Sequence, residues 1–257
     1  MMSSTRPVDA LRLNRPEIAV FVSGVASMGL EILAGRMIAP QFGSSIYTWG
    51  TIIGVFLAAL SYGYHRGGKL AAERATNGRM ARVFLLTAVY VAGLILIGDV
   101  LLRATSGFPL PSRIASLPAV TLLFGPPTYL LGYVSPYAAE LSAKEGLGEA
   151  SGHVYMLGTV GSIVGAFATT YLLIPLLGIT QIALVFGALS IAAALAIGRP
   201  IGRERAAVTG FVALLLVAAA ATGAAGYTVQ GEVVYETQTP YQQLRVVDLG
   251  DTRTLYL

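Results

Sequence analysis

The sequence contains no cysteine, which excludes disulfide bonds, thiolate metal sites and cysteine nucleophiles. Histidine is almost as scarce, because His65 and His153 stand far apart and form no recognisable metal-binding motif. Charged residues make up only 12% of the chain, about half the share in a typical soluble domain. The chain therefore has too few polar side chains to cover a soluble fold, and no metal centre is expected.

Apolar residues and glycine fill the chain instead. Hydrophobic residues make up 55% of it, the mean hydropathy is +0.70, and there are 30 glycines. A helix needs about 20 apolar residues to cross a bilayer. Seven stretches qualify: 18–39, 47–64, 83–102, 115–141, 153–174, 181–197 and 207–225. The sequence thus predicts an all-α polytopic membrane helix bundle of about seven transmembrane helices in the lipid bilayer.

The basic residues predict how the bundle is oriented. They gather in the N-terminal tail 1–17, in the loop expected at 65–82, and in 199–205. All three segments lie on the cytoplasmic side if the N-terminus is inside, as the positive-inside rule requires. The net charge of +4 is thereby explained by topology, and no nucleic-acid partner is expected. A multi-pass cell-membrane protein with an odd number of spans then has its C-terminus outside.

The last segment, 226–257, differs in character from the seven spans. Its alternating runs "EVVYET", "QQLRVVDL" and "TLYL", with a turn at "LGD", are typical of strands and of a short C-terminal β-hairpin. So small a sheet is marginally stable by itself. The expected division is a cytoplasmic tail (1–17), a transmembrane bundle (18–225) and the start of an incomplete soluble β domain (226–257).

Glu31 and Arg36 stand inside the first span, where an uncompensated carboxylate costs about 3 kcal/mol. Five residues on a helix separate two side chains by about 140°, so the two do not share one face. One interpretation is a site in which Glu31 receives a cation or a proton. The other is structural, with Glu31 in an ion pair or bonded to a hydroxyl or indole of a neighbouring helix.

The fourth span carries "GPP" at 125–127 and a further proline, Pro136, which predict an interrupted or kinked helix. Interrupted helices line many transporter sites. Tyr129 and Tyr133 begin a four-residue aromatic repeat in this span, which either packs against a neighbour or stacks on a cation. Glu31, Arg36, Tyr129 and Tyr133 are accordingly the candidate intramembrane site. In the fifth span, Gly161 and Gly165 form a GxxxG pattern, which predicts close helix packing.

Two blocks of the sequence carry a combined pattern. In the first block, a Glu and an Arg five apart precede "P-x-F-G-S-S", an aromatic residue, and "G-x-x-x-G-G". The residues that carry the first block are Glu31, Arg36, Pro40, Phe42, Gly43, Ser44, Ser45, Trp49, Gly63, Gly67 and Gly68. The second block is "YETQTPYQQLRVVDLGDTRTLYL". The first block resembles membrane-embedded spermidine synthase-like proteins, in which a multi-span N-terminal part is fused to a polyamine aminopropyltransferase-like domain, and the second is similar to the opening β-hairpin of aminopropyltransferases.

The resemblance implies a co-substrate, decarboxylated S-adenosylmethionine, and a polyamine acceptor. It also implies a substrate-binding Gln242 supported by Tyr241. The glycine-rich nucleotide-binding segment and the catalytic acids are absent from this sequence, so the resemblance implies no cofactor and no aminopropyl transfer for this chain alone. The missing domain is expected in cis or in trans. Seven spans place the C-terminal tail outside the cell, where decarboxylated S-adenosylmethionine is not expected. Either one span is therefore not a full crossing, or the appended domain has another activity.

Three hypotheses about function follow. The first is the membrane domain of a spermidine synthase-like protein, which anchors the appended domain and handles a polyamine or a related small cation with Glu31 as the counter-charge. The second is a stand-alone secondary transporter of a small cationic solute. The third is a structural membrane scaffold with neither activity.

Overall fold

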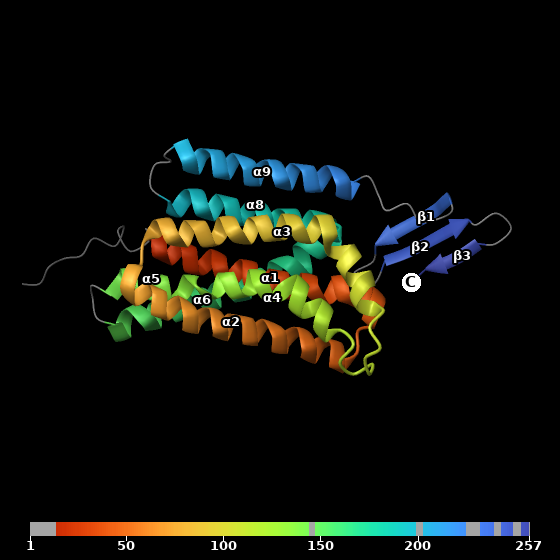
Figure 1. The fold of residues 1–257 in the computed structure, drawn as a ribbon, viewed down its shortest axis with the longest axis horizontal. Coiled ribbons are helices and arrows are strands. Elements are labelled where there is room, and N and C mark those ends of the chain that lie inside the picture. The colour runs from red at the N-terminus through yellow and green to blue at the C-terminus, as the bar shows by residue number, and fades with distance from the viewer. Residues whose placement is uncertain are drawn as a thin grey trace, which may run out of the picture.

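The computed structural model describes residues 14–143, 147–198, 203–224, 232–238, 243–248 and 253–256, and most of them lie in helices that run along one common axis (Figure 1). The helices are α1 Arg15–Phe42, α2 Ile46–Arg74, α3 Asn77–Ser106, α4 Leu117–Gly132, α5 Val134–Ser142, α6 Leu147–Phe167, the π-helix η3 Ala168–Leu173, α7 Ile174–Leu176, α8 Ile179–Ile197 and α9 Arg203–Ala224. Helices α4 and α5 together form one rod, and α6, η3 and α7 form another.

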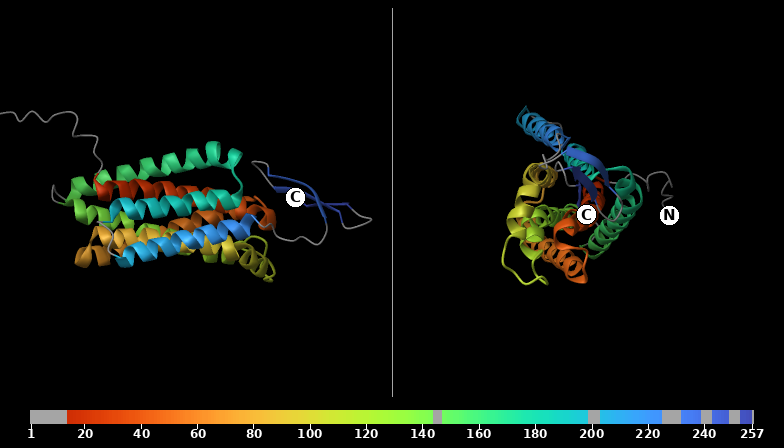
Figure 2. Two further views of the ribbon diagram at one scale, coloured as in Figure 1. Left: turned by 90° about the horizontal axis from the view of Figure 1, so that it is seen from above. Right: turned by 90° about the vertical axis from the view of Figure 1, so that its right-hand side faces the viewer.

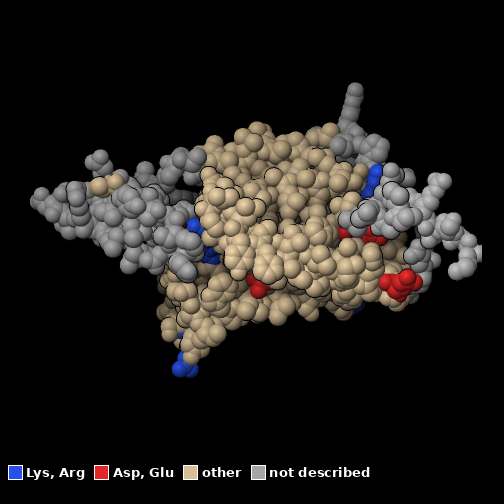
Figure 3. All heavy atoms as spheres, turned by 180° about the vertical axis from the view of Figure 1, so that it is seen from behind, with Lys and Arg blue, Asp and Glu red and all other residues tan. Residues whose placement is uncertain are grey.

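Six rods in the described part of the chain are long and apolar enough to cross a membrane. A further helix, α9, has 22 residues and is apolar over 208–221. At about 1.5 Å per residue the whole helix is roughly 33 Å long, whereas its apolar part is about 21 Å long, which is shorter than a hydrocarbon core of about 30 Å. On the face of the bundle that Figure 3 shows, a broad surface with almost no charge lies between the two ends, interrupted by acidic atoms partway along it. The prediction of a multi-pass helical membrane bundle is therefore confirmed.

The basic loop predicted at 65–82 is wrong, because nearly all of that segment is helical. Helix α2 continues to Arg74 and α3 begins at Asn77, which leaves a two-residue connection. Thr76 caps α3, since its hydroxyl accepts a hydrogen bond from the Arg79 backbone N–H at 3.2 Å. Hydropathy marks only the part of a helix that lies in lipid, whereas Lys and Arg are good helix formers that extend it into water.

Helix α1 is the central element of the bundle (Figure 2). It packs most extensively on α6 and α8, and it also contacts α2, α3, α4 and α5. Helix α9 lies on the outside against α3 and α8 (Figure 1). The largest fully buried side chains of the core are Phe56, Phe84, Phe124, Phe186, Leu30, Leu33, Ile38, Ile52, Met80, Leu123, Leu131 and Ile182. A polar residue on α1 is therefore surrounded by other helices over much of its length.

Glycines bring α1 and α6 into backbone contact, as the GxxxG pattern predicted. A Cβ added to Gly161 would lie 2.2 Å from the Phe21 carbonyl oxygen, and one added to Gly165 would lie 2.4 Å from that of Val25. On the other helix, a Cβ at Gly24 would lie 2.3 Å from the Gly158 carbonyl oxygen. The two helices thus approach more closely than any residue with a side chain would permit.

The interruption of the fourth span lies at Tyr133, between α4 and α5, and not at the "GPP" prolines. Pro136 explains its position, because a proline ring clashes with the carbonyl four residues before it, which here is that of Gly132. Pro126 and Pro127 lie inside α4. Pro126 leaves the Leu122 carbonyl without its helical donor, and the Tyr90 hydroxyl of α3 donates to that carbonyl instead.

Tyr90→Phe is expected to lower the free energy of unfolding by about 1 kcal/mol, because the Leu122 carbonyl then has no donor inside the membrane. The change is measured by circular dichroism of the purified protein during titration with SDS. Tyr171→Phe is the matched control, since Tyr171 is 72% exposed. Equal stability losses in the two variants would contradict the role assigned to Tyr90.

Three strands follow the bundle: β1 Glu232–Gln238, β2 Gln243–Asp248 and β3 Arg253–Tyr256. They form an antiparallel sheet in the order β1-β2-β3, with one irregularity in the register between Val233 and Tyr235. The sheet lies beyond the end of the bundle at which α9 finishes, and α1 begins at the opposite end (Figure 1).

Candidate functional site

Glu31 lies well inside the membrane on the central helix. It is about 24 Å along α1 from Arg15, by the helical rise, and its side chain is partly buried. Within the described part of the chain, the only carboxylate that forms an ion pair is that of Glu17, whose Oε1 lies 3.5 Å from His153 Nε2 at the start of the bundle. Glu31 and Arg36 form no ion pair with each other, in agreement with the prediction that they do not share one face of the helix.

Arg36 instead binds the end of the fifth rod. Its Nη1 donates to the carbonyl oxygens of Ile174 at 3.2 Å and Leu177 at 3.3 Å. These carbonyls belong to the last turn of that rod and to the residue after it, where the helix leaves its carbonyl groups without partners and carries a partial negative charge. Arg36 therefore has a structural role in joining α1 to the end of α7.

Tyr129 and Tyr133 do come together, as expected, and their hydroxyls share a hydrogen bond. Their rings meet edge to face at 5.1 Å between centroids, and Tyr62 of α2 stacks on Tyr129 at 5.4 Å. Arg66 of α2 lies beside the two hydroxyls. Because the protein supplies this cation itself, the geometry favours the packing interpretation of the tyrosines.

A small polar cavity of about 180 Å³ lies between α1, α2, α4, α5 and α6. Its distinguishing feature is the number of hydroxyl groups on its wall, contributed by Ser23, Ser27, Tyr64, Ser135, Tyr155, Thr159 and Ser162. Ser23 and Ser27 are buried, whereas Tyr64 and Tyr155 are 40% and 69% exposed and form its rim. So many hydroxyls around one space give this cavity a polar wall within otherwise apolar helices.

A second cavity of about 230 Å³ adjoins the first. The two share Tyr64, Ser135, Val154 and Tyr155, and the second one adds Ser151 near the start of α6. Together they form an elongated space that extends from the middle of the bundle toward the end at which α1 begins. We call these two spaces the hydroxyl cavity.

Glu31 stands one helical turn beyond the hydroxyl cavity. Ser23, Ser27 and Glu31 follow one another at four-residue spacing on α1, so each is rotated by about 40° from the one before. Ser23 and Ser27 face the cavity between Tyr64 of α2 and Thr159 of α6. The carboxylate therefore lies on the same side of α1, at the end of the row of hydroxyls.

This arrangement provides many neutral oxygen acceptors, two tyrosine rings and one carboxylate. Hydroxyl oxygens accept hydrogen bonds from an ammonium group, and tyrosine faces attract cations. The described residues contain no group of three or more His, Asp or Glu side chains that could hold a metal ion. The chemistry is therefore better suited to an organic ammonium ion than to a divalent metal, which requires several carboxylate or carbonyl ligands.

The remaining predicted site residues, Tyr241 and Gln242, lie outside the described residues. The sequence did not indicate the hydroxyl cavity. A serine or threonine in a membrane helix is common and often bonds its own backbone, as Ser23 does by donating to the Val20 carbonyl at 2.9 Å. The one available signal was the spacing of Ser23, Ser27 and Glu31.

Comparison of the chain with protein-family models, with curated proteins and with solved structures finds no match.

Proposed function

We propose that this chain is the membrane domain of a spermidine synthase-like protein and that it binds a polyamine or a related small organic cation in the hydroxyl cavity. The family assignment depends on the two sequence blocks described above. The cation-binding role depends on the bundle itself. In this proposal the β strands begin the synthase-like domain, and the bundle anchors that domain in the membrane.

One observation carries the cation-binding proposal: the buried hydroxyls of Ser23 and Ser27 line a cavity, and Glu31 follows them on the same face of α1. A carboxylate held in a membrane is stabilised by a positive charge, and the described residues give Glu31 no cationic partner. A polyamine would supply that charge at one end. The elongated shape of the cavity suits the rest of a linear molecule.

The cavity is also an argument for the stand-alone transporter, because it is built entirely from membrane helices. Tyr64 and Tyr155 at its rim give it an opening between α2 and α6. The two proposals share the site and differ in whether the bound cation crosses the membrane.

The proposal is tested by equilibrium binding of radiolabelled spermidine to the purified full chain in detergent. We expect saturable binding of about one molecule per chain, with competition by a linear diamine and none by a neutral diol of the same length. Absence of saturable binding, or equal competition by the diol, would overturn the proposal. Uptake of the same label into liposomes containing the protein then separates a transporter from an anchoring domain that only binds.

A further inference from the structure

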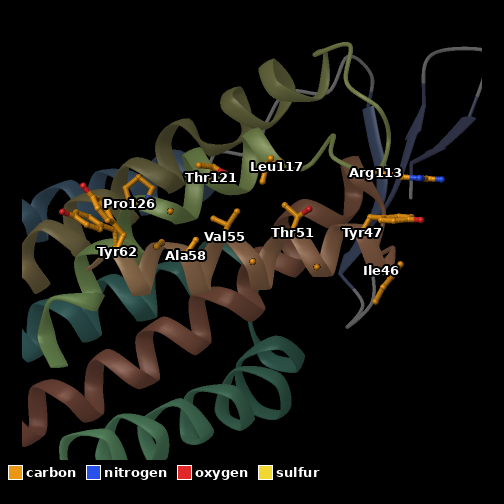
Figure 4. A pocket seen from close by; sticks show the side chains of 15 residues that line it. Ile46, Tyr47, Thr51, Val55, Ala58, Tyr62, Arg113, Leu117, Thr121 and Pro126 are labelled. Atoms are coloured by element: carbon orange, nitrogen blue, oxygen red, sulfur yellow. The ribbon is translucent and has the colours of Figure 1, made fainter. Parts of the chain in front are cut away.

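A separate groove of about 970 Å³ lies between α2 and α4 on the surface of the bundle (Figure 4). Tyr47 and Arg113 lie at one end of it, and Tyr62 and Pro126 lie at the other (Figure 4). The hydroxyl cavity lies on the other side of α2, and the two spaces share no lining residue. The groove is therefore independent of the site proposed above.

The helix packing explains why the groove is closed at one end and open at the other. At Gly63 the two helices touch, since a Cβ added there would lie 2.4 Å from the Tyr129 carbonyl oxygen and 3.0 Å from the Gly132 Cα. The stacked rings of Tyr62 and Tyr129 close the groove just before this contact. From there α2 and α4 diverge toward Tyr47, where the groove is open.

The walls of the groove are smooth and apolar over the depth of one leaflet. On α2 they include Gly50, Gly54 and Ala58, which follow at four-residue spacing and leave the groove without obstruction. The helical rise from Tyr47 to Tyr62 is about 22 Å. Half of a bilayer of about 40–45 Å, headgroup regions included, is about 20–22 Å, so the groove reaches from headgroup level to the middle of the bilayer.

The mouth of the groove carries a positive charge. The Arg113 guanidinium lies over the Tyr47 ring, 5.7 Å from its centroid, and is exposed. Among the residues that the structure describes, no carboxylate lies within ion-pair distance of Arg113. A guanidinium held on an aromatic ring at the membrane surface is well placed to bind a phosphate through two parallel hydrogen bonds.

We propose that this groove binds one anionic phospholipid from the leaflet at which α2 begins, with the phosphate on Arg113 and one acyl chain between α2 and α4. The depth of the groove, its apolar walls and the charge at its mouth match the three parts of such a lipid. A zwitterionic lipid offers the same chains and a phosphate, but its ammonium group reduces the attraction to Arg113.

The test uses phosphatidylglycerol as the probe, added to the purified full chain in a neutral detergent and observed by native mass spectrometry. We expect one lipid to be retained per chain, and phosphatidylcholine to be retained about fivefold less well. Arg113→Gln is expected to remove this difference between headgroups. Gly54→Leu is expected to weaken retention of both lipids at least tenfold, because the new side chain projects into the groove.

Gly93→Leu on α3 is the matched control. A Cβ added at Gly54 or at Gly93 has no atom within 4 Å, so neither leucine disturbs the packing of the protein, and only Gly54 lines the groove. Equal retention in the Gly54→Leu and Gly93→Leu variants would overturn the proposal. Equal retention of phosphatidylglycerol and phosphatidylcholine by the unmodified protein would also overturn it. A third contradicting result would be a covalent dimer, formed when an azide photocrosslinker placed at position 54 reacts with a second copy of the chain.

Discussion

Glu31→Gln is expected to weaken spermidine binding about a thousandfold and at the same time to leave the bundle as stable as before or more stable. Glutamine has nearly the shape of glutamate and lacks its charge. An ammonium about 4 Å from the carboxylate gains roughly 4 kcal/mol at an effective dielectric constant of about 20, and this gain is lost in the variant. The cost of holding an unpaired charge in the membrane is lost as well.

The opposite signs of these two effects make the experiment decisive. Binding is measured with labelled spermidine, and stability is measured by circular dichroism during SDS titration. Glu73→Gln is the matched control, because Glu73 is exposed near the end of α2 and lies outside the hydroxyl cavity. Unchanged binding in Glu31→Gln would remove this carboxylate from the site. A large loss of stability would show that Glu31 has a structural partner.

Gly161→Ala is expected to destabilise the bundle by about 1–3 kcal/mol, because even one methyl group does not fit between α1 and α6. The added Cβ would lie 2.2 Å from the Phe21 carbonyl oxygen and 3.0 Å from the Phe21 carbonyl carbon. These are backbone atoms, so the helices must separate. The separation would also widen the gap between Ser27 and Ser162 and weaken spermidine binding.

Gly152→Ala on the same helix provides the control for this variant. A Cβ added at Gly152 has no neighbour within 4 Å, and alanine favours a helix over glycine. This variant is therefore expected to be as stable as the unmodified protein or slightly more stable in SDS titration. A similar result for Gly161→Ala would contradict the close contact between α1 and α6.

The sequence was sufficient to predict the helical bundle, because lipid requires long apolar runs whose backbone groups bond within one segment. The predicted ends and interruptions of the helices were partly wrong, because hydropathy does not measure where a helix ends or bends. Residues 65–74 are helical although they are basic, and η3 was not expected. The interruption at Tyr133 follows from Pro136 alone, whereas Pro126 is accommodated by Tyr90 of another helix, and such a partner is not visible in the local sequence.

Only those features of the site that depend on a single helix could be predicted from the sequence. The geometry of α1 already separated Glu31 from Arg36 by about 140°. That Arg36 binds the Ile174 carbonyl, or that Tyr64 and Thr159 face Ser27, depends on which helices are neighbours. The groove depends further on the close contact between α2 and α4 at Gly63 and Gly132, and no single segment encodes that contact.

The positions of the cavity and of the sheet have a consequence for any chemistry linked to this bundle. The second cavity, which Ser151 helps to line, and the sheet β1-β2-β3 lie toward opposite ends of the helices. In the proposed function, a cation bound near Ser151 reaches the synthase-like domain that begins with this sheet only after passing along the bundle. Capture of the cation at one end and its delivery at the other would then be coupled through the bundle.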